Sequence, residues 1–82
     1  MDSVQTDQDE NIVKVKLNLD FYSVEDVLAA TKDFFDLGQI NMAVDDKNNN
    51  VIITISPKDK ADRLETIGYE FCNYVLGMTK NR

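Results

Sequence analysis

The stretch Tyr22-Ser23-Val24-Glu25-Asp26-Val27-Leu28 carries the clearest structural signal in this 82-residue chain. The Ser23 hydroxyl can accept a hydrogen bond from the backbone N–H near Asp26, and Asp26 stands at the acidic position of a capping box. Tyr22 and Val27 occupy the two positions of a hydrophobic staple. The residues that follow recur at helical spacing, and Leu37-Gly38 is a typical helix end. The residues at this spacing are Val24, Val27, Leu28, Thr31, Phe34 and Phe35. A helix that begins at Ser23 is therefore predicted.

Alternating residues on either side of this helix predict three strands. In the first, Lys14, Lys16 and Asn18 alternate with apolar positions, which are Val13, Val15, Leu17 and Leu19. The second contains Ile40, Met42 and Val44, and the third contains Val51, Ile53 and Ile55. Pro57 lacks an N–H group and closes the third strand. Residues 45–50 are all polar and tolerate turn conformations, so the second and third strands should form an antiparallel hairpin.

A second helix is predicted from about Asp59. Its apolar face comprises Leu64, Ile67, Phe71, Tyr74 or Val75, and Met78. Gly68 weakens such a helix by about 1 kcal/mol relative to alanine, unless its small size allows a neighbouring element to pack closely.

These elements define an α+β fold. A right-handed crossover makes the second strand parallel to the first, and the third fits between them in antiparallel orientation. The expected domain, residues 12–82, is a three-stranded sheet of order 2-3-1 with both helices on one face. This is a ferredoxin-like arrangement that lacks its last strand, and it leaves the strand of residues 12–19 as an open edge. The other sheet face would expose Lys14, Lys16, Asn18, Asn41, Ala43, Ile52, Thr54 and Ser56.

Composition indicates one small acidic domain. Apolar residues make up 43% and charged residues 29% of the chain, which is typical of globular proteins, and 82 residues supply only one core. The net charge is −6, and residues 1–11 contain four carboxylates without Lys or Arg. We expect these eleven residues to form a flexible acidic tail. The negative charge disfavours nucleic acid, and the absence of a long apolar run or signal peptide favours the cytoplasm without membrane attachment.

The residue types indicate no catalytic, cofactor or metal site. There is no histidine, and Cys72, the single cysteine, is expected to be a small buried side chain. The run Asp46-Lys47-Asn48-Asn49-Asn50 resembles the start of a calcium loop. However, Val51 stands at the loop position that requires Gly, and Pro57 stands at the position that requires a bidentate Glu. The three glycines are isolated, so no phosphate-binding loop is present. We therefore expect a protein that is not an enzyme and needs no cofactor.

An open strand edge offers N–H and C=O groups to a strand from another chain. The candidate partner-binding edge consists of Lys14, Lys16 and Asn18 on the strand of residues 12–19. Natural sheets also protect edges with lysine, so Lys14 and Lys16 have a second interpretation as a guard against aggregation.

Part of the chain resembles a known family. The similarity is carried by Val15-Lys16-Leu17-Asn18, the stretch from Tyr22 to Ala30, Phe34, the strand from Asn50 to Ser56 and the segment from Glu70 to Leu76. These segments are similar to the small D component of the His-Xaa-Ser repeat system. Thr31 departs from the aromatic residue expected there, and the chain stops at Arg82, short of the family's longer arm. The resemblance implies a non-enzymatic accessory of radical-SAM enzymes that modify a ribosomally made peptide.

Two functions follow from these observations. The first is a protein-interaction module whose partner is another chain, such as a radical-SAM maturase or its precursor peptide. The alternative is a self-associating regulatory domain, in which two copies form a homodimer. A third class, an enzyme, would have to build acid–base chemistry from carboxylates and lysines alone.

Overall fold

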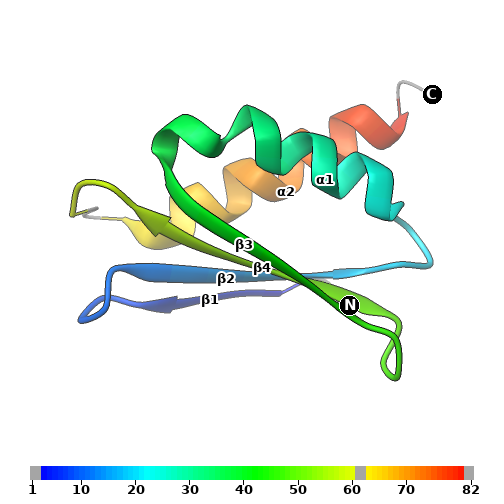
Figure 1. The fold of residues 1–82 in the computed structure, drawn as a ribbon, viewed down its shortest axis with the longest axis horizontal. Helices are drawn as coiled ribbons and strands as arrows, with labels where there is room; N and C mark the ends of the chain where they lie inside the picture. The colour runs from blue at the N-terminus through cyan, green and yellow to red at the C-terminus, as the bar shows by residue number, and fades with distance from the viewer. Residues whose placement is uncertain (1–2, 61–62, 81–82) are drawn as a thin grey trace.

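The computed structural model describes residues 3–60 and 63–80. Within these residues, four strands and two α-helices follow one another. They are β1 (Ser3–Asp7), β2 (Ile12–Asn18), α1 (Val24–Asp33), β3 (Gly38–Asp45), β4 (Asn50–Pro57) and α2 (Leu64–Lys80), with a short 3-10 helix η1 (Phe35–Leu37) before β3. Both helices cover the same face of one antiparallel sheet (Figure 1).

The sheet has the order β1-β2-β4-β3. The predicted arrangement of the three expected strands is confirmed, because β4 lies between β2 and β3 and is antiparallel to both. The prediction of only three strands is wrong. Ser3–Asp7, expected to belong to a flexible tail, pairs with β2 in a register that runs from Ser3 opposite Lys16 to Asp7 opposite Ile12. An edge strand gains stability from ladder hydrogen bonds, which a search for apolar periodicity does not detect.

The β1–β2 turn closes through short polar side chains. The Asp7 carboxylate accepts a hydrogen bond from the Glu10 N–H at 3.1 Å, and Asn11 has a positive φ of 55°. The Asn11 side-chain amide donates to the carbonyls of Pro57 at 3.3 Å and Asp59 at 3.1 Å. The turn is thereby joined to the end of β4.

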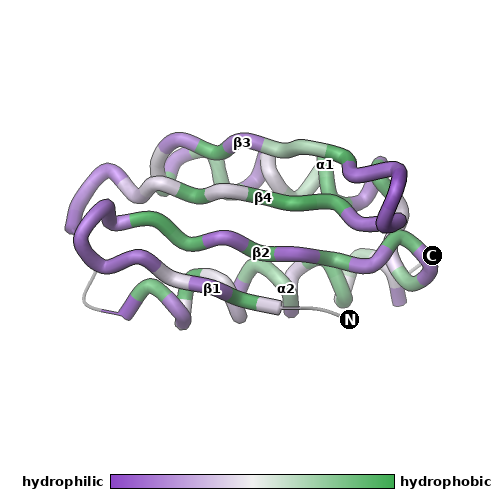
Figure 2. The backbone as a smooth tube through the Cα atoms, turned by 90° about the horizontal axis from the view of Figure 1, so that it is seen from below, coloured by the Kyte–Doolittle hydropathy of each residue, from purple (hydrophilic) through white to green (hydrophobic). Residues whose placement is uncertain are grey.

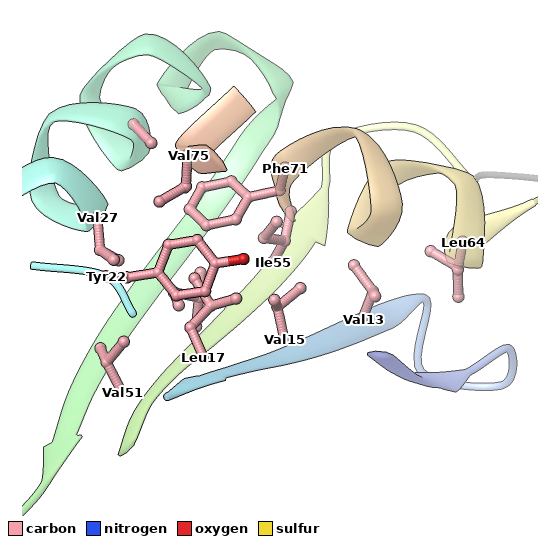
Figure 3. Close-up of a cluster of buried hydrophobic side chains, with 12 residues drawn as sticks. Val13, Val15, Leu17, Tyr22, Val27, Val51, Ile55, Leu64, Phe71 and Val75 are labelled. Atoms are coloured by element: carbon pink, nitrogen blue, oxygen red, sulfur yellow. The ribbon is translucent and has the colours of Figure 1, made fainter. Parts of the chain in front are cut away.

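The core lies between the sheet and the helices, as the alternation predicts. Fully buried side chains come from β2 (Val13, Val15, Leu17), β4 (Val51, Ile53, Ile55), α1 (Val27, Ala30) and α2 (Leu64, Phe71, Val75). They meet in one cluster that also includes Tyr22 (Figure 3). Val75 is buried whereas Tyr74 is 42% exposed, which decides between the two candidate core positions in the second helix.

The start of α1 is as predicted. The Ser23 hydroxyl accepts a hydrogen bond from the Asp26 N–H at 3.1 Å, and both staple residues, Tyr22 and Val27, are buried. The chain after η1 enters β3 at Gly38, which is buried. A Cβ atom at Gly38 would collide with the backbone of Ser56 and Pro57, so this close approach of β3 to β4 requires glycine.

The sheet face opposite the helices, which is turned toward the viewer in Figure 2, is mostly polar according to the pairing registers. Its pairing registers place Lys14 beside Thr54 and Thr54 beside Asn41, while Lys16 lies beside Ile52 and Ile52 beside Ala43. The predicted composition of this face is thus confirmed. In the described part of the chain, neither helix has the length and apolar character needed to cross a membrane.

Candidate interaction surfaces

The predicted binding edge is already paired. β1 covers β2 from Ile12 to Lys16, so Lys14 and Lys16 lie on a central strand. Their backbone groups bond to β1, and their side chains extend over the polar face next to Ser3 and Gln5. The open-edge prediction therefore needs correction: the edges of the described sheet are β1 and β3.

Asn18, the third residue of that predicted edge, organises the turn into α1. Its side-chain oxygen accepts a hydrogen bond from the Asp20 N–H at 2.7 Å. Its backbone carbonyl accepts from the N–H groups of Phe21 and Tyr22 at 3.1 and 3.2 Å. These contacts give Asn18 a local structural role in positioning the start of the helix.

A signal for β1 is present in the sequence, although it is weak. Val4 is the only apolar side chain in Ser3–Asp7, and the run from Asp7 to Asn11 has turn-forming residues. Together they describe a short hairpin with one buried contact. Negative charge in this region favoured the interpretation as a tail, because acidic segments with few apolar residues are commonly disordered.

On the polar face, next to the β3–β4 turn, the Asp45 carboxylate interacts with the Lys16 side chain. A side-chain hydrogen bond from Asn48, 2.8 Å long, is the main cause that holds the pKa of Asp45 below its ordinary value. The positive charge of Lys16 makes a smaller contribution in the same direction. Asp45 thus stabilises the β3–β4 turn, and its charge is partly balanced by a lysine on β2.

β3 is an open edge whose outward backbone groups can be assigned. The Lys58 N–H donates to the Leu37 carbonyl at 2.9 Å, and this bond fixes the phase of the ladder between β3 and β4. Because hydrogen-bonded and non-hydrogen-bonded pairs alternate in an antiparallel ladder, the N–H and C=O groups of Ile40, Met42 and Val44 point away from β4. The side chains of these three residues belong to the helix-covered face.

A groove lies between η1 and α2. Its lining combines apolar and acidic side chains, which are Asp33, Phe34, Asp36, Leu37, Ile67 and Glu70, around a volume of about 390 Å³. We call this the helix groove. None of its lining residues is basic, so the groove has an apolar floor and a negatively charged rim.

Aromatic packing fixes the floor of the helix groove. The Phe34 ring meets Phe71 edge-to-face with 5.2 Å between centroids and Tyr74 with 5.4 Å. The Tyr74 hydroxyl donates a hydrogen bond to the Asp33 carboxylate, and this bond raises the pKa of Tyr74 above its ordinary value. α1 and α2 are thereby held together at one wall of the groove, while Phe35 next to it is 69% exposed.

A second hollow, at the opposite end of the helices, contains a buried carboxylate. Asp26 is only 7% exposed and accepts a hydrogen bond from the Thr79 hydroxyl at 3.2 Å. The same hydroxyl lies 3.0 Å from the Val75 carbonyl within α2, so its single proton is shared between the two acceptors. The Thr79–Asp26 bond ties the start of α1 to the end of α2, which is a structural function.

Cys72 is half-buried on α2 and lines a shallow hollow with Ser3, Val4 and Tyr69. Within residues 3–60 and 63–80, no three Cys, Asp or Glu side chains lie close enough together to hold a metal ion.

Comparisons of this chain with known protein families, with curated proteins and with solved structures gave no match.

Proposed function

We propose that this chain is a non-enzymatic protein-interaction module whose helix groove receives a partner segment that is both basic and apolar. The observation that carries the proposal is the lining of the groove, in which Phe34, Leu37 and Ile67 are accompanied by three carboxylates and no lysine or arginine. An apolar side chain of the partner would gain burial on this floor. Lysine or arginine beside it would meet Asp36 and Glu70, and such charge complementarity provides specificity and orientation.

The groove is preorganised for binding. Phe34 is held by two edge-to-face contacts, and the Tyr74–Asp33 hydrogen bond fixes the neighbouring wall. A binding surface that needs no rearrangement loses less conformational entropy when the partner arrives. Phe35, which follows Phe34 in the chain, is an exposed apolar side chain outside the groove lining.

A defined peptide probe tests this proposal. We would titrate the ¹⁵N-labelled protein with a synthetic peptide that carries leucine and lysine at helical spacing and follow backbone amide shifts. We expect the largest shifts at Leu37 and Ile67, and binding about fivefold weaker in the variant Asp36→Asn/Glu70→Gln, since each exposed ion pair contributes up to about 1 kcal/mol.

The matched control is Asp9→Asn/Asp46→Asn, which removes the same charge from two exposed turn residues outside the groove. If both double variants weakened binding equally, the attraction would be a property of the net charge and the groove would not be the site. Shifts concentrated on the polar sheet face would also contradict the proposal.

The family resemblance supplies a narrower proposal for the partner, a radical-SAM maturase or its precursor peptide. The residues that carry the resemblance include Tyr22, Val27, Phe71 and Val75, which are core residues in this fold. The resemblance therefore supports similarity of architecture more than similarity of a site. Co-expression with a radical-SAM maturase tests it: we expect co-purification with the parent chain and reduced recovery with Asp36→Asn/Glu70→Gln.

A further inference from the structure

β3 is an unusually unprotected edge. It is eight residues long, whereas the other open edge of the described sheet, β1, has five. Natural proteins protect long edges with lysine, proline or bulges. β3 contains neither lysine nor proline, its register with β4 is continuous, and Asp45 at its end is its one charged residue.

The chemistry of this edge is self-complementary. We propose that β3 pairs in antiparallel orientation with β3 of a second copy of this chain, around a two-fold axis at Met42. In this register Ile40 lies opposite Val44 of the second copy, and the two Met42 residues lie opposite each other. These are the residues whose backbone groups point outward, so three hydrogen-bonded pairs with about six hydrogen bonds form.

Side chains match in the same register. Ile40, Met42 and Val44 all belong to the helix-covered face, so apolar residues oppose apolar residues. Asp45 lies opposite Gln39, and like charges do not face each other anywhere along the paired strands. A two-fold interface uses one patch on both copies, and this strand satisfies that requirement.

An exposed apolar side chain lies on the helix-covered face of this edge, because Val44 is 45% exposed. α1 lies behind β3 when the sheet is viewed from its polar face (Figure 2). Pairing of two copies places Val44 opposite Ile40 of the second copy and removes part of its apolar surface from water. The surface is separate from the helix groove, so the self-association does not depend on the proposed function.

Analytical ultracentrifugation over a concentration series tests the proposal. The parent chain should approach twice its mass of 9.4 kDa. The variant Val44→Pro removes an N–H that points away from β4, so the ladder inside the monomer stays intact. We expect its dimer dissociation constant to rise at least tenfold.

The matched control is Thr6→Pro on the other edge. The Leu19–Asn49 hydrogen bond sets the phase of the β2–β4 ladder, and this phase turns the Thr6 N–H away from β2. The same loss of an outward N–H on β1 should leave the dimer unchanged. Abolition of the dimer by Thr6→Pro would overturn the assignment to β3.

A second variant keeps the test decisive if Val44→Pro fails to fold. Val44→Lys places a protective charge at a half-exposed position, and circular dichroism should show a folded monomer with the same loss of association. Isotope-filtered NOEs between Ile40 of one copy and Val44 of the other should be present in the parent dimer. A parent chain that stays monomeric at millimolar concentration, or a dimer that tolerates Val44→Lys, would overturn the proposal.

Discussion

Val4 of β1 and Gly68 of α2 lie so close together that a Cβ atom on Gly68 would stand 2.5 Å from Val4 Cγ1. The same atom would stand 3.0 Å from Val13 Cγ2. Gly68 therefore lets α2 approach the β1–β2 pair, which is the close packing that the sequence offered as one explanation of this glycine. The contact joins the chain's first described segment to its last helix, and β1 becomes part of the packed domain.

This contact predicts energetic coupling between the two positions. Alanine at Gly68 gains about 1 kcal/mol of helix propensity, but its methyl group would displace Val4 from its site. We expect Gly68→Ala to destabilise the parent chain and to be markedly less harmful in a Val4→Ala background. Urea denaturation of the two single variants and the double variant measures the coupling. Additive effects would show that Val4 does not restrict the space beside Gly68.

Removal of the N-terminal strand should destabilise the domain. A chain that begins at Gln8 loses the β1 ladder and exposes the edge of β2, together with the apolar surface around Val13. We expect a lower melting temperature and concentration-dependent aggregation, because β2 then offers an uncovered edge. Retention of the parent's melting temperature would instead restore the interpretation of these residues as a dispensable tail.

The Ser23 cap should contribute measurably to stability. Ser23→Ala removes the acceptor of the Asp26 N–H, and the expected loss is about 1 kcal/mol of unfolding free energy. Ser23→Asp retains an acceptor and should recover most of that loss. Chemical denaturation of the three proteins provides the comparison, and equal stability of all three would contradict the assigned cap.

Phe34 and Phe35 form a matched pair for testing the core. Phe34 packs against Phe71 and Tyr74, whereas Phe35 is 69% exposed. Phe34→Ala should cost about 3 kcal/mol because it leaves a cavity, and Phe35→Ala should cost less than about 0.5 kcal/mol. Thermal or urea unfolding distinguishes them. A reversed order would place Phe35 in the core and Phe34 at the surface.

The Tyr74–Asp33 hydrogen bond predicts a pH dependence on the alkaline side. It raises the pKa of Tyr74 in the folded protein, so the folded state retains the proton more tightly than the unfolded state. Its stabilising effect is fully present below the unfolded pKa of about 10 and is lost as pH rises through the folded pKa. NMR titration of ¹³C-labelled tyrosine rings should show Tyr74 titrating late, and Asp33→Asn should lower its pKa. An unchanged pKa in that variant would exclude Asp33 as the cause.

The elements marked by short-range signals were predictable from sequence. The Ser23 cap, the alternation of β2 and β4 and the turn residues of 45–50 each depend on neighbours within a few positions. Asn49 has a positive φ of 55°, which agrees with the left-handed tolerance expected of that turn. The binary pattern also placed Lys14 and Lys16 on the face away from the helices, because successive side chains in a strand point to opposite faces.

Tertiary structure alone decided which edge of the sheet is open. The sequence of Ser3–Asp7 contains a single apolar residue, and its pairing becomes favourable only once β2 presents a ladder and Gly68 leaves space for Val4. The helix groove likewise joins η1 to residues of α2 that are about thirty positions away in the chain. Local sequence encodes conformation and burial, but pairing partners and concave surfaces depend on interactions between distant segments, whose energies no single stretch of residues reveals.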